Sequence, residues 1–387
     1  MKKVLFALMS MAVVMFTSCS KDDDNNGDNT ESNVLATQDV NNGETLELDG
    51  GYVLNGTLSV KDGGTLNIAA GTEIVANEGF GKYIIVEQGG KINVKGTAAL
   101  PVKMIGKEEK AGYWGGLIIN GYGLVSGTND PAVTANVGLT EVNSNLPYGG
   151  TIENDNSGSI TYLILGQTGA KSSANVEHNG LTLNAVGSGT KIENIYVYQG
   201  ADDAVEFFGG SVSVTNFLSV DSDDDMFDFT QGYTGTLTNA YGIWTSAHTS
   251  SEKDPRGVEA DGNLDGEFPN HLHQSNFTIA NMTIFHENSG TGTTAPWDAM
   301  QDAIKIRRGA TAIITNAFVK SLGTIQDGVD LSDGNGTAAD GTNISVKFEV
   351  ATLDRAINLA STSATVTENA ANSGCSTSIF DWTGFGF

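Results

Sequence analysis

The chain of 387 residues carries a formal charge of −26 and contains 49 glycines but 6 prolines. So strong a negative charge repels nucleic acid at long range, and it excludes nucleic-acid binding as a first hypothesis. The high glycine content and the 8% of aromatic residues are typical of many short strands and tight turns, and they disfavour a helix bundle.

Residues 1–18 have the features of an export signal. Lys2 and Lys3 precede an apolar run from Val4 to Phe16, which is too short to cross a bilayer as a stable helix. The run ends in the segment FTSCS, which resembles the lipobox of bacterial lipoproteins. The resemblance implies cleavage before Cys19, acylation of its thiol with a fatty acid such as palmitate, and attachment to the outer membrane. A plain secretory signal with an incidental cysteine is the alternative.

Residues 19–36 follow as an acidic tether. The segment SKDDDNNGDNTES holds no apolar residue that a fold could bury, so we expect it to be disordered. Lys21 followed by three aspartates resembles the surface-export signal of lipoproteins of the Bacteroidetes group, and this resemblance implies display on the cell surface. We assign residues 37–387 to one folded domain, because no later segment resembles an interdomain linker.

Five segments from Ile192 onward share a strand-like pattern around one asparagine. At their shortest intervals of 22 and 23 residues, these asparagines recur with the period of one coil of parallel strands. Stacked coils place equivalent side chains about 4.8 Å apart, so asparagine amides can hydrogen-bond in a ladder along the stack. The column comprises Asn194, Asn216, Asn239, Asn281 and Asn316.

A second strand follows each asparagine strand, and its apolar residues alternate with a period of two. Its third and fifth positions are apolar in nearly every copy, as are Val205 and Phe207 in the segment DAVEF. This alternation sends the third and fifth side chains into the core and the second and fourth outward. The same period excludes a helix, because the apolar residues form no stripe with helical spacing.

We therefore predict an all-β protein that is a single parallel β-helix. A resemblance rests on the glycine-rich start from Gly56 to Val94, WGGLIING from Trp114, GADDAVEFFGG from Gly200, and the terminal FDWTGFGF. Together these segments resemble a family of Bacteroidetes surface lipoproteins with a pectin-lyase-like β-helix, which implies a right-handed coil and no settled activity. We expect four aromatic residues near the end of the chain to cap the open coil: Phe380, Trp382, Phe385 and Phe387.

The outward face of the second strand forms a shallow trough that is lined by charge. Its second position is small in six of seven copies, and its fourth position is acidic on three consecutive coils, at Glu206, Asp228 and Glu259. Like charges about 4.8 Å apart repel one another. We expect a raised pKa, a bound cation, or Lys305 and Arg307 on the next coil to compensate them.

Insertions indicate that the trough binds a ligand. Loops of unusual length follow Asn239 and Asn281, and a third insertion runs from Gly262 to Asn276. Long loops on a rigid solenoid commonly carry binding residues. We therefore predict a ligand-binding groove formed by Trp244, His248, Glu259, Asp261, His286, Trp297, Lys305 and Arg307.

Several functions fit such a groove. Aromatic faces stack on sugar rings and carboxylates hold hydroxyl groups, so our leading hypothesis is non-catalytic binding of a polysaccharide or another cell-surface ligand. A glycoside hydrolase would use Asp228 and Glu259 as acid and base. A polysaccharide lyase would hold calcium on acidic side chains and use Lys305, Arg307 or Arg308 as the base, by analogy with lyases of this fold. The third alternative is a structural or adhesion module without a small ligand.

We expect no resident cofactor, although the sequence leaves calcium open. In the run DSDDDMFD the candidate ligands are Asp223, Asp225 and Asp228, but Met226 stands where a calcium loop needs glycine. Aspartates that cap strand amides at a turn are the alternative. The sequence does not determine the oligomeric state.

Overall fold

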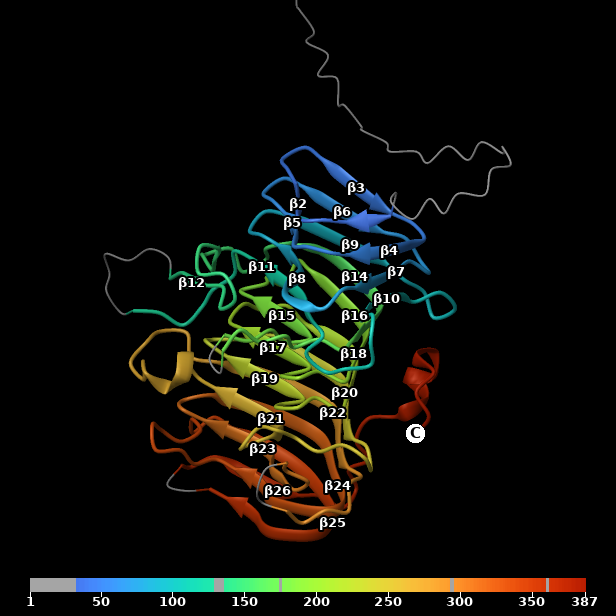
Figure 1. Ribbon diagram of the computed structural model, residues 1–387. Coiled ribbons are helices and arrows are strands. Elements are labelled where there is room, and N and C mark those ends of the chain that lie inside the picture. Colours follow the sequence, from blue (N-terminus) through green and yellow to red (C-terminus); the bar gives the residue numbers. More distant parts are fainter. Residues whose placement is uncertain (1–32, 129–135, 174–175, 293–295, 360–361) are drawn as a thin grey trace, which may run out of the picture.

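The computed structural model of the chain describes residues 33–128, 136–173, 176–292, 296–359 and 362–387 (Figure 1). The predicted export signal, Cys19 and nearly all of the predicted tether lie outside the described residues. Within these ranges the regular elements are β-strands and two short 3₁₀ helices, and no helix is long and apolar enough to cross a membrane. The strands wind around one axis as a right-handed parallel β-helix, which confirms the predicted fold class.

Three parallel ladders of strands run along the axis, and each strand pairs with the equivalent strand one coil further on. The first ladder starts with β1 (Val34–Leu35), β4 (Gly51–Leu54), β7 (Glu73–Ala76) and β10 (Val102–Gly106). The second ladder contains β2 (Gln38–Val40), β5 (Leu58–Val60), β8 (Gly79–Val86), β11 (Trp114–Asn120), β15 (Leu181–Asn184), β17 (Val205–Phe208), β19 (Phe227–Thr230), β21 (Arg256–Asp261) and β23 (Met300–Arg307). The third ladder starts with β3 (Thr45–Leu48), β6 (Thr65–Ile68) and β9 (Lys91–Lys95).

In the later coils, single strands bend and serve both the third and the first ladder. These strands are β14 (Gly158–Gly166), β16 (Lys191–Tyr198), β18 (Val214–Val220), β20 (Thr236–Trp244) and β22 (Asn276–His286). Two longer strands run through all three ladders, and one short strand follows them: β24 (Thr311–Asp330), β25 (Asn343–Asn358) and β26 (Thr365–Glu368). Outside the ladders lie β12 (Gly138–Leu139), β13 (Pro147–Tyr148), η1 (Leu264–Gly266) and η2 (Thr377–Thr383).

The predicted asparagine ladder lies at the bend of these strands. The backbone φ angles of its five asparagines are between 55° and 62°, in the left-handed region that asparagine tolerates better than most residues. From Asn216 onward, each Nδ2 donates a hydrogen bond to the Oδ1 of the asparagine one coil earlier, at 2.8 to 2.9 Å. The ladder is confirmed, and asparagine recurs because one side chain both suits the corner and satisfies its neighbour.

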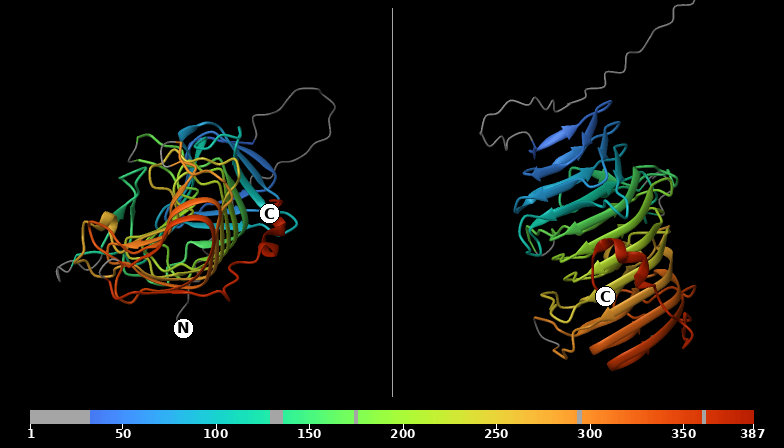
Figure 2. Two further views of the ribbon diagram at one scale, coloured as in Figure 1. Left: turned by 90° about the horizontal axis from the view of Figure 1, so that it is seen from below. Right: turned by 90° about the vertical axis from the view of Figure 1, so that its right-hand side faces the viewer.

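The inward positions of the second ladder form the core, as the alternation predicted. Val205, Phe207, Phe227 and Phe229 are fully buried. The ring of Phe229 stacks on Phe207 with centroids 4.9 Å apart and on Phe277 with centroids 4.3 Å apart. Stacked rings hold successive coils in register. Seen along the axis, the coils lie over one another around this core (Figure 2).

The aromatic residues near the end of the chain do not cap the coil, so this prediction is wrong. The chain leaves the last coil, turns back and lays η2 against the outer face of the first ladder (Figure 1, Figure 2). Phe380 is fully buried there in one cluster with Leu218 and Tyr241, and Trp382 meets Tyr162 edge-on at 5.2 Å. The physical reason is that the outer face of the first ladder is itself apolar and needs a cover.

Candidate functional site

The outer face of the second ladder is the floor of the candidate site. Its fourth positions lie over one another, because Thr182 pairs with Glu206, Glu206 with Asp228, and Asp228 with Glu259. The predicted acidic column is confirmed. Two residues further along the same strands, a second outward column is formed by Asn184, Phe208, Thr230 and Asp261.

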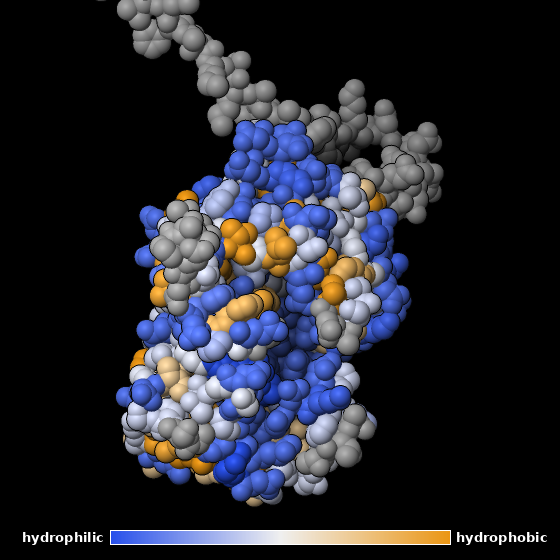
Figure 3. All heavy atoms as spheres, turned by 90° about the vertical axis from the view of Figure 1, so that its left-hand side faces the viewer, coloured by the Kyte–Doolittle hydropathy of each residue, from blue (hydrophilic) through white to orange (hydrophobic). Residues whose placement is uncertain are grey.

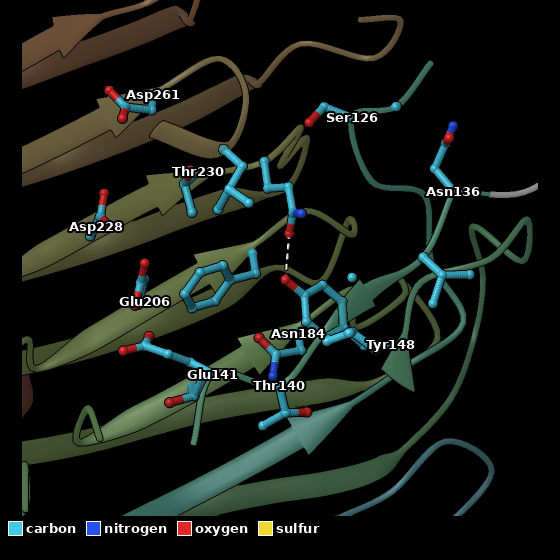
Figure 4. Close-up of a pocket in the computed structure, with 18 of the residues that line it drawn as sticks. Ser126, Asn136, Thr140, Glu141, Tyr148, Asn184, Glu206, Asp228, Thr230 and Asp261 are labelled. Carbon is cyan, nitrogen blue, oxygen red and sulfur yellow. Dashed lines mark hydrogen bonds between the residues drawn. The ribbon is translucent and has the colours of Figure 1, made fainter. Parts of the chain in front are cut away.

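Two insertions wall this floor. Residues 121–128 and 136–157 follow β11 and carry the hairpin of β12 and β13, and residues 262–275 follow β21 and carry η1. The walls join where the amides of Gly127 and Leu272 each donate to the other's carbonyl, at 3.2 and 2.9 Å. Floor and walls enclose a cavity of about 1000 Å³ (Figure 4). This volume is at the upper end of the range of small-molecule pockets.

Hydrogen bonds fix the longer wall to the floor. Asn184 Nδ2 donates to Asn120 Oδ1 at 2.9 Å, and Asn120 Nδ2 donates to Thr140 Oγ1 of the wall at 2.7 Å. Tyr148 Oη donates to Gln231 Oε1 at 2.6 Å (Figure 4). The wall is therefore an ordered part of the site, held by buried polar groups that pair with one another.

Apolar side chains stand at the rim of the cavity. Val137 and Leu139 of the longer wall are 58% and 57% exposed, and Phe268 of the shorter wall is 38% exposed. Figure 3 shows this face of the molecule, where apolar patches lie beside strongly hydrophilic surface. An apolar rim above a polar floor suits a ligand that carries both C–H faces and hydroxyl groups.

Two carboxyl groups at the centre of the floor form no ion pair within the described ranges. Glu206 accepts a hydrogen bond from Asn179 Nδ2 at 2.6 Å and hydrogen-bonds with Asp228. Burial raises the pKa of Glu206 well above its usual range, and the charge of Asp228 adds to this. Burial also raises the pKa of Asp228 to about 7, with a further contribution from the charge of Asp261. A shared proton therefore compensates this part of the acidic column near neutral pH.

Arginines compensate the third acid of the column. Glu259 contacts Arg256 of its own strand and Arg307 of the next coil. Arg307 Nε also donates to Asp261 Oδ1 at 2.8 Å, and Arg308 Nη1 donates to Asp261 Oδ2 at 2.6 Å. Three of the predicted ligand-binding residues, Glu259, Asp261 and Arg307, therefore line the cavity together, and they hold one another there.

Lys305 is not among the residues that line the cavity. It is 7% exposed, and its Nζ donates to Asp330 Oδ2 at 2.6 Å. On the next coil Arg355 forms two hydrogen bonds with Asp327, both at 2.6 Å. Beyond β21 the outer face of the second ladder is thus a ladder of ion pairs, and Lys305 is occupied by its neighbour.

The predicted aromatic and histidine ligands lie outside the cavity. Trp244, at the end of β20, is fully buried, and its Nε1 donates to the carbonyl of Ser222 at 3.0 Å. His286, at the end of β22, is also fully buried and shares a hydrogen bond with Ser321 Oγ at 2.9 Å. The ring of His248 packs on Trp244 with centroids 4.6 Å apart. These side chains close the corner between the first and second ladders, so a ligand in the cavity does not reach them.

Trp297 is partly exposed but does not line the cavity. Its main chain pairs with Ser250, which ties together the two loops that follow β20 and β22. Among the described residues of the three insertions predicted to border the groove, only those in 262–275 contribute to its lining. The reason is that the other two loops lead into the strands of the second ladder, whereas the cavity walls emerge from the opposite ends of those strands.

The structure regroups the predicted calcium ligands. Asp223 accepts hydrogen bonds from the amide and hydroxyl of Ser251, as expected for an aspartate that caps a turn. Three groups of carboxylates occur in the described ranges, and within each group one oxygen per residue lies within 4.8 Å of the others. The groups are Asp202, Asp203 and Asp224; Asp203, Glu206 and Asp228; and Asp302, Asp327 and Asp330.

Sequence reasoning missed the longer wall of the cavity, which contributes Thr140, Glu141 and Tyr148 to the lining. The signal was present in the spacing. Asn120 and Asn184 end equivalent strands on adjacent coils, yet 64 residues separate them. So long an interval on one coil indicates an insertion, and it follows the strand at the same end as residues 262–275.

Fold and site together define a parallel β-helix with an acidic cavity on the outer face of its second ladder. A family model described as a pectate-lyase-like β-helix domain matches residues 38–385, and the chain belongs to this family. Membership makes it a carbohydrate-related β-helix protein. Comparisons with curated proteins and with solved structures gave no match.

Proposed function

We propose that the cavity binds a neutral glycan without converting it chemically. The observation that carries the proposal is the cavity of about 1000 Å³, whose floor offers carboxylate, amide and hydroxyl groups beneath an apolar rim. Sugar hydroxyls pair with the polar groups, and the C–H faces of sugar rings pack on the apolar ones. Membership of the pectate-lyase-like β-helix family supports carbohydrate as the class of ligand.

The charge of the cavity favours neutral glycans over polymers of uronic acids. Arg307 is held by Glu259 and Asp261, and burial lowers the pKa of His271, whose ring is therefore neutral at pH 7. A uronate carboxylate would lie against the negative charge that Glu206 and Asp228 keep when they share one proton. The acidic residues of the lining are Glu141, Glu177, Glu206, Asp228, Glu259 and Asp261.

The ion pairs favour binding over catalysis. A hydrolase that used Asp228 and Glu259 would need a free carboxylate as base, but Arg256 and Arg307 hold Glu259. A lyase would need Lys305 or Arg307 free to act as the base, but Asp330 pairs with Lys305, and Glu259 and Asp261 pair with Arg307. A purely structural module would fill the trough with its own loops, whereas an open cavity lies between the described residues.

The proposal includes display at the outer membrane through a lipidated Cys19. The lipobox-like segment FTSCS and the acidic stretch that follows it support this part. Labelling of expressing cells with palmitate should mark the wild type and not Cys19→Ala. Labelling that persists in Cys19→Ala, or no labelling of the wild type, would contradict the anchor. Digestion of the protein by protease added to intact cells would support surface display.

A glycan array followed by calorimetric titration tests the binding site. Glu206→Gln changes the floor and Phe268→Ala changes the rim, and each should weaken binding about tenfold or more. The matched controls are Glu193→Gln on the third ladder and Leu322→Ala, an apolar side chain that is 57% exposed outside the cavity. The controls should bind like the wild type. If both cavity variants also bind like the wild type, the ligand occupies another surface, and if no glycan binds, carbohydrate is the wrong class.

Product analysis separates binding from catalysis. The glycan that binds should keep its chain length after prolonged incubation with the protein. If new reducing ends form with the wild type and not with Glu259→Gln, the protein is a glycoside hydrolase and not only a binding protein. If unsaturated uronides form with the wild type and not with Arg307→Ala, the protein is a polysaccharide lyase.

A further inference from the structure

Three carboxylates form a group beside the cavity. Asp202 and Asp203 precede β17, and Asp224 precedes β19 one coil further on. One carboxylate oxygen of each lies within 4.8 Å of the other two. None of the three residues lines the cavity, but Asp203 also groups with Glu206 and Asp228 of the cavity floor, so the group lies next to the proposed glycan site.

The group lacks the compensation that other carboxylates of the chain receive. Asp202 is 8% exposed and Asp203 is 7% exposed. Asp203 Oδ1 accepts one hydrogen bond, from the backbone amide of Asp225 at 2.8 Å. Within the described ranges, no hydrogen bond or ion pair reaches the Asp202 carboxylate, and the buried Oδ1 of Asp224 has no hydrogen-bond partner. Carboxylates removed from water without a partner are strongly disfavoured, and a bound cation is one way to supply the missing charge.

The basic side chains whose charge reaches the group are engaged elsewhere. Lys171 pairs with Glu177 at 2.8 Å and with Glu252 at 2.7 Å. Arg256 pairs with Asp254 at 2.7 Å on the next coil. Neither forms an ion pair with the three carboxylates, so no basic side chain of the described structure neutralises the group.

We propose that Asp202, Asp203 and Asp224 bind one calcium ion. The group offers carboxylate oxygens and no nitrogen or sulfur ligand, which is the donor set that a hard divalent cation prefers. Oxygens up to 4.8 Å apart can each lie about 2.3–2.6 Å from a common Ca²⁺. Mg²⁺ requires shorter distances of about 2.0–2.1 Å and stricter octahedral geometry, so calcium fits the group better. The ion would join two successive coils at the start of β17 and β19.

In each of the other two groups, a side chain of the protein already binds at least one carboxylate. In the group on β23 and β24, Arg355 holds Asp327 and Lys305 holds Asp330. In the group that faces the cavity, Glu206 already accepts a side-chain hydrogen bond. These two groups therefore supply the control positions for a test of the first.

Calorimetric titration of calcium into the chelator-treated full chain tests the proposal, together with thermal unfolding in calcium and in chelator. We expect one ion to bind the wild type and to raise its midpoint of unfolding. Asp202→Asn and Asp224→Asn should each weaken calcium binding about tenfold or more and abolish the rise. The controls Glu206→Gln and Asp330→Asn should keep calcium binding and the rise of the unfolding midpoint in calcium.

A second readout distinguishes a ligand from a structural side chain. In chelator, Asp202→Asn removes a buried unpaired charge, so its midpoint should equal or exceed that of the wild type. A lower midpoint in chelator would show that Asp202 stabilises the fold by itself, which overturns the proposal. The proposal is also overturned if millimolar calcium gives neither heat nor a higher midpoint in the wild type, or if Glu206→Gln loses binding while Asp202→Asn retains it.

Discussion

The asparagine ladder provides a graded test of the coil geometry. Asn239 lies in the middle of the ladder, where its Nδ2 donates to Asn216 at 2.8 Å and its Oδ1 accepts from Asn281 at 2.9 Å. Asn194 lies at the start and forms one such bond, because its Oδ1 accepts from Asn216. A substitution at position 239 therefore removes two ladder hydrogen bonds, and a substitution at position 194 removes one.

The expected losses follow from these contacts. Each lost hydrogen bond costs about 1 kcal/mol, and a residue other than glycine or asparagine in the left-handed region costs about 1 kcal/mol more. Asn239→Gly should therefore lower the free energy of unfolding by about 2 kcal/mol through the ladder, and Asn194→Gly by about 1 kcal/mol. Asn239→Ala should lose about 3 kcal/mol, because alanine adds the backbone strain. The extra freedom that glycine gives the unfolded chain affects both glycine variants alike, so it cancels in their comparison.

Urea unfolding followed by circular dichroism measures these differences. Equal losses in Asn194→Gly and Asn239→Gly would refute the ladder as a source of stability. Equal losses in Asn239→Ala and Asn239→Gly would refute the contribution of the left-handed corner.

Three further results are expected. Burial lowers the pKa of His178 from 6.5 to about 4, so the unfolded chain binds more protons than the folded chain between pH 6.5 and pH 4. The stability that neutral His178 contributes is therefore fully present above pH 6.5. About 3 kcal/mol of the free energy of unfolding is lost as the pH falls to 4. The difference in unfolding free energy between the wild type and His178→Phe should show this pH dependence, and a constant difference would contradict it. Phe380→Ala should weaken the packing of η2 on the first ladder by about 3 kcal/mol. Limited proteolysis should then release the η2 segment, while the circular dichroism signal of the β-strands persists. Loss of that β-strand signal would contradict the described packing. Arg307→Ala should lower the free energy of unfolding by about 3 kcal/mol, because it leaves buried carboxylates without one of their partners. The control Lys347→Ala should change the free energy of unfolding by less than about 0.5 kcal/mol, because its partner Glu349 is exposed. Similar losses in the two variants would refute this reasoning.

The repeating features of the fold could be predicted from the sequence because each depends only on the adjacent coils. Asn216, like Asn239 and Asn281, has an asparagine above it and another below it, and its distance along the chain from Asn194 is the length of one coil. The acidic column followed from the same period, since Glu206 and Asp228 occupy equivalent positions on successive strands. Periodicity thus determined the coil, the core positions and the floor of the cavity.

The non-repeating features could not be predicted in this way, because tertiary packing places them. Trp244 is the last residue of a strand and precedes a long loop, which is typical of an exposed residue, yet its ring fills the corner between two ladders. The terminal aromatic residues had two apolar surfaces to cover, the open end and the first ladder, and η2 packs on the ladder. One of the two arginine partners of Glu259 could be predicted. Arg307 lies on the next coil and follows from the strand register, whereas Arg256 lies on the same strand as Glu259 and was not predicted.

Hydrogen–deuterium exchange with and without the bound glycan tests most directly the central claim that the acidic cavity is the binding site. We predict slower exchange with the glycan in residues 136–148, in residues 264–272 and in β17 and β19, and unchanged exchange in residues 245–255. Slower exchange confined to residues 245–255, or to the outer face of the first ladder beneath η2, would contradict the account.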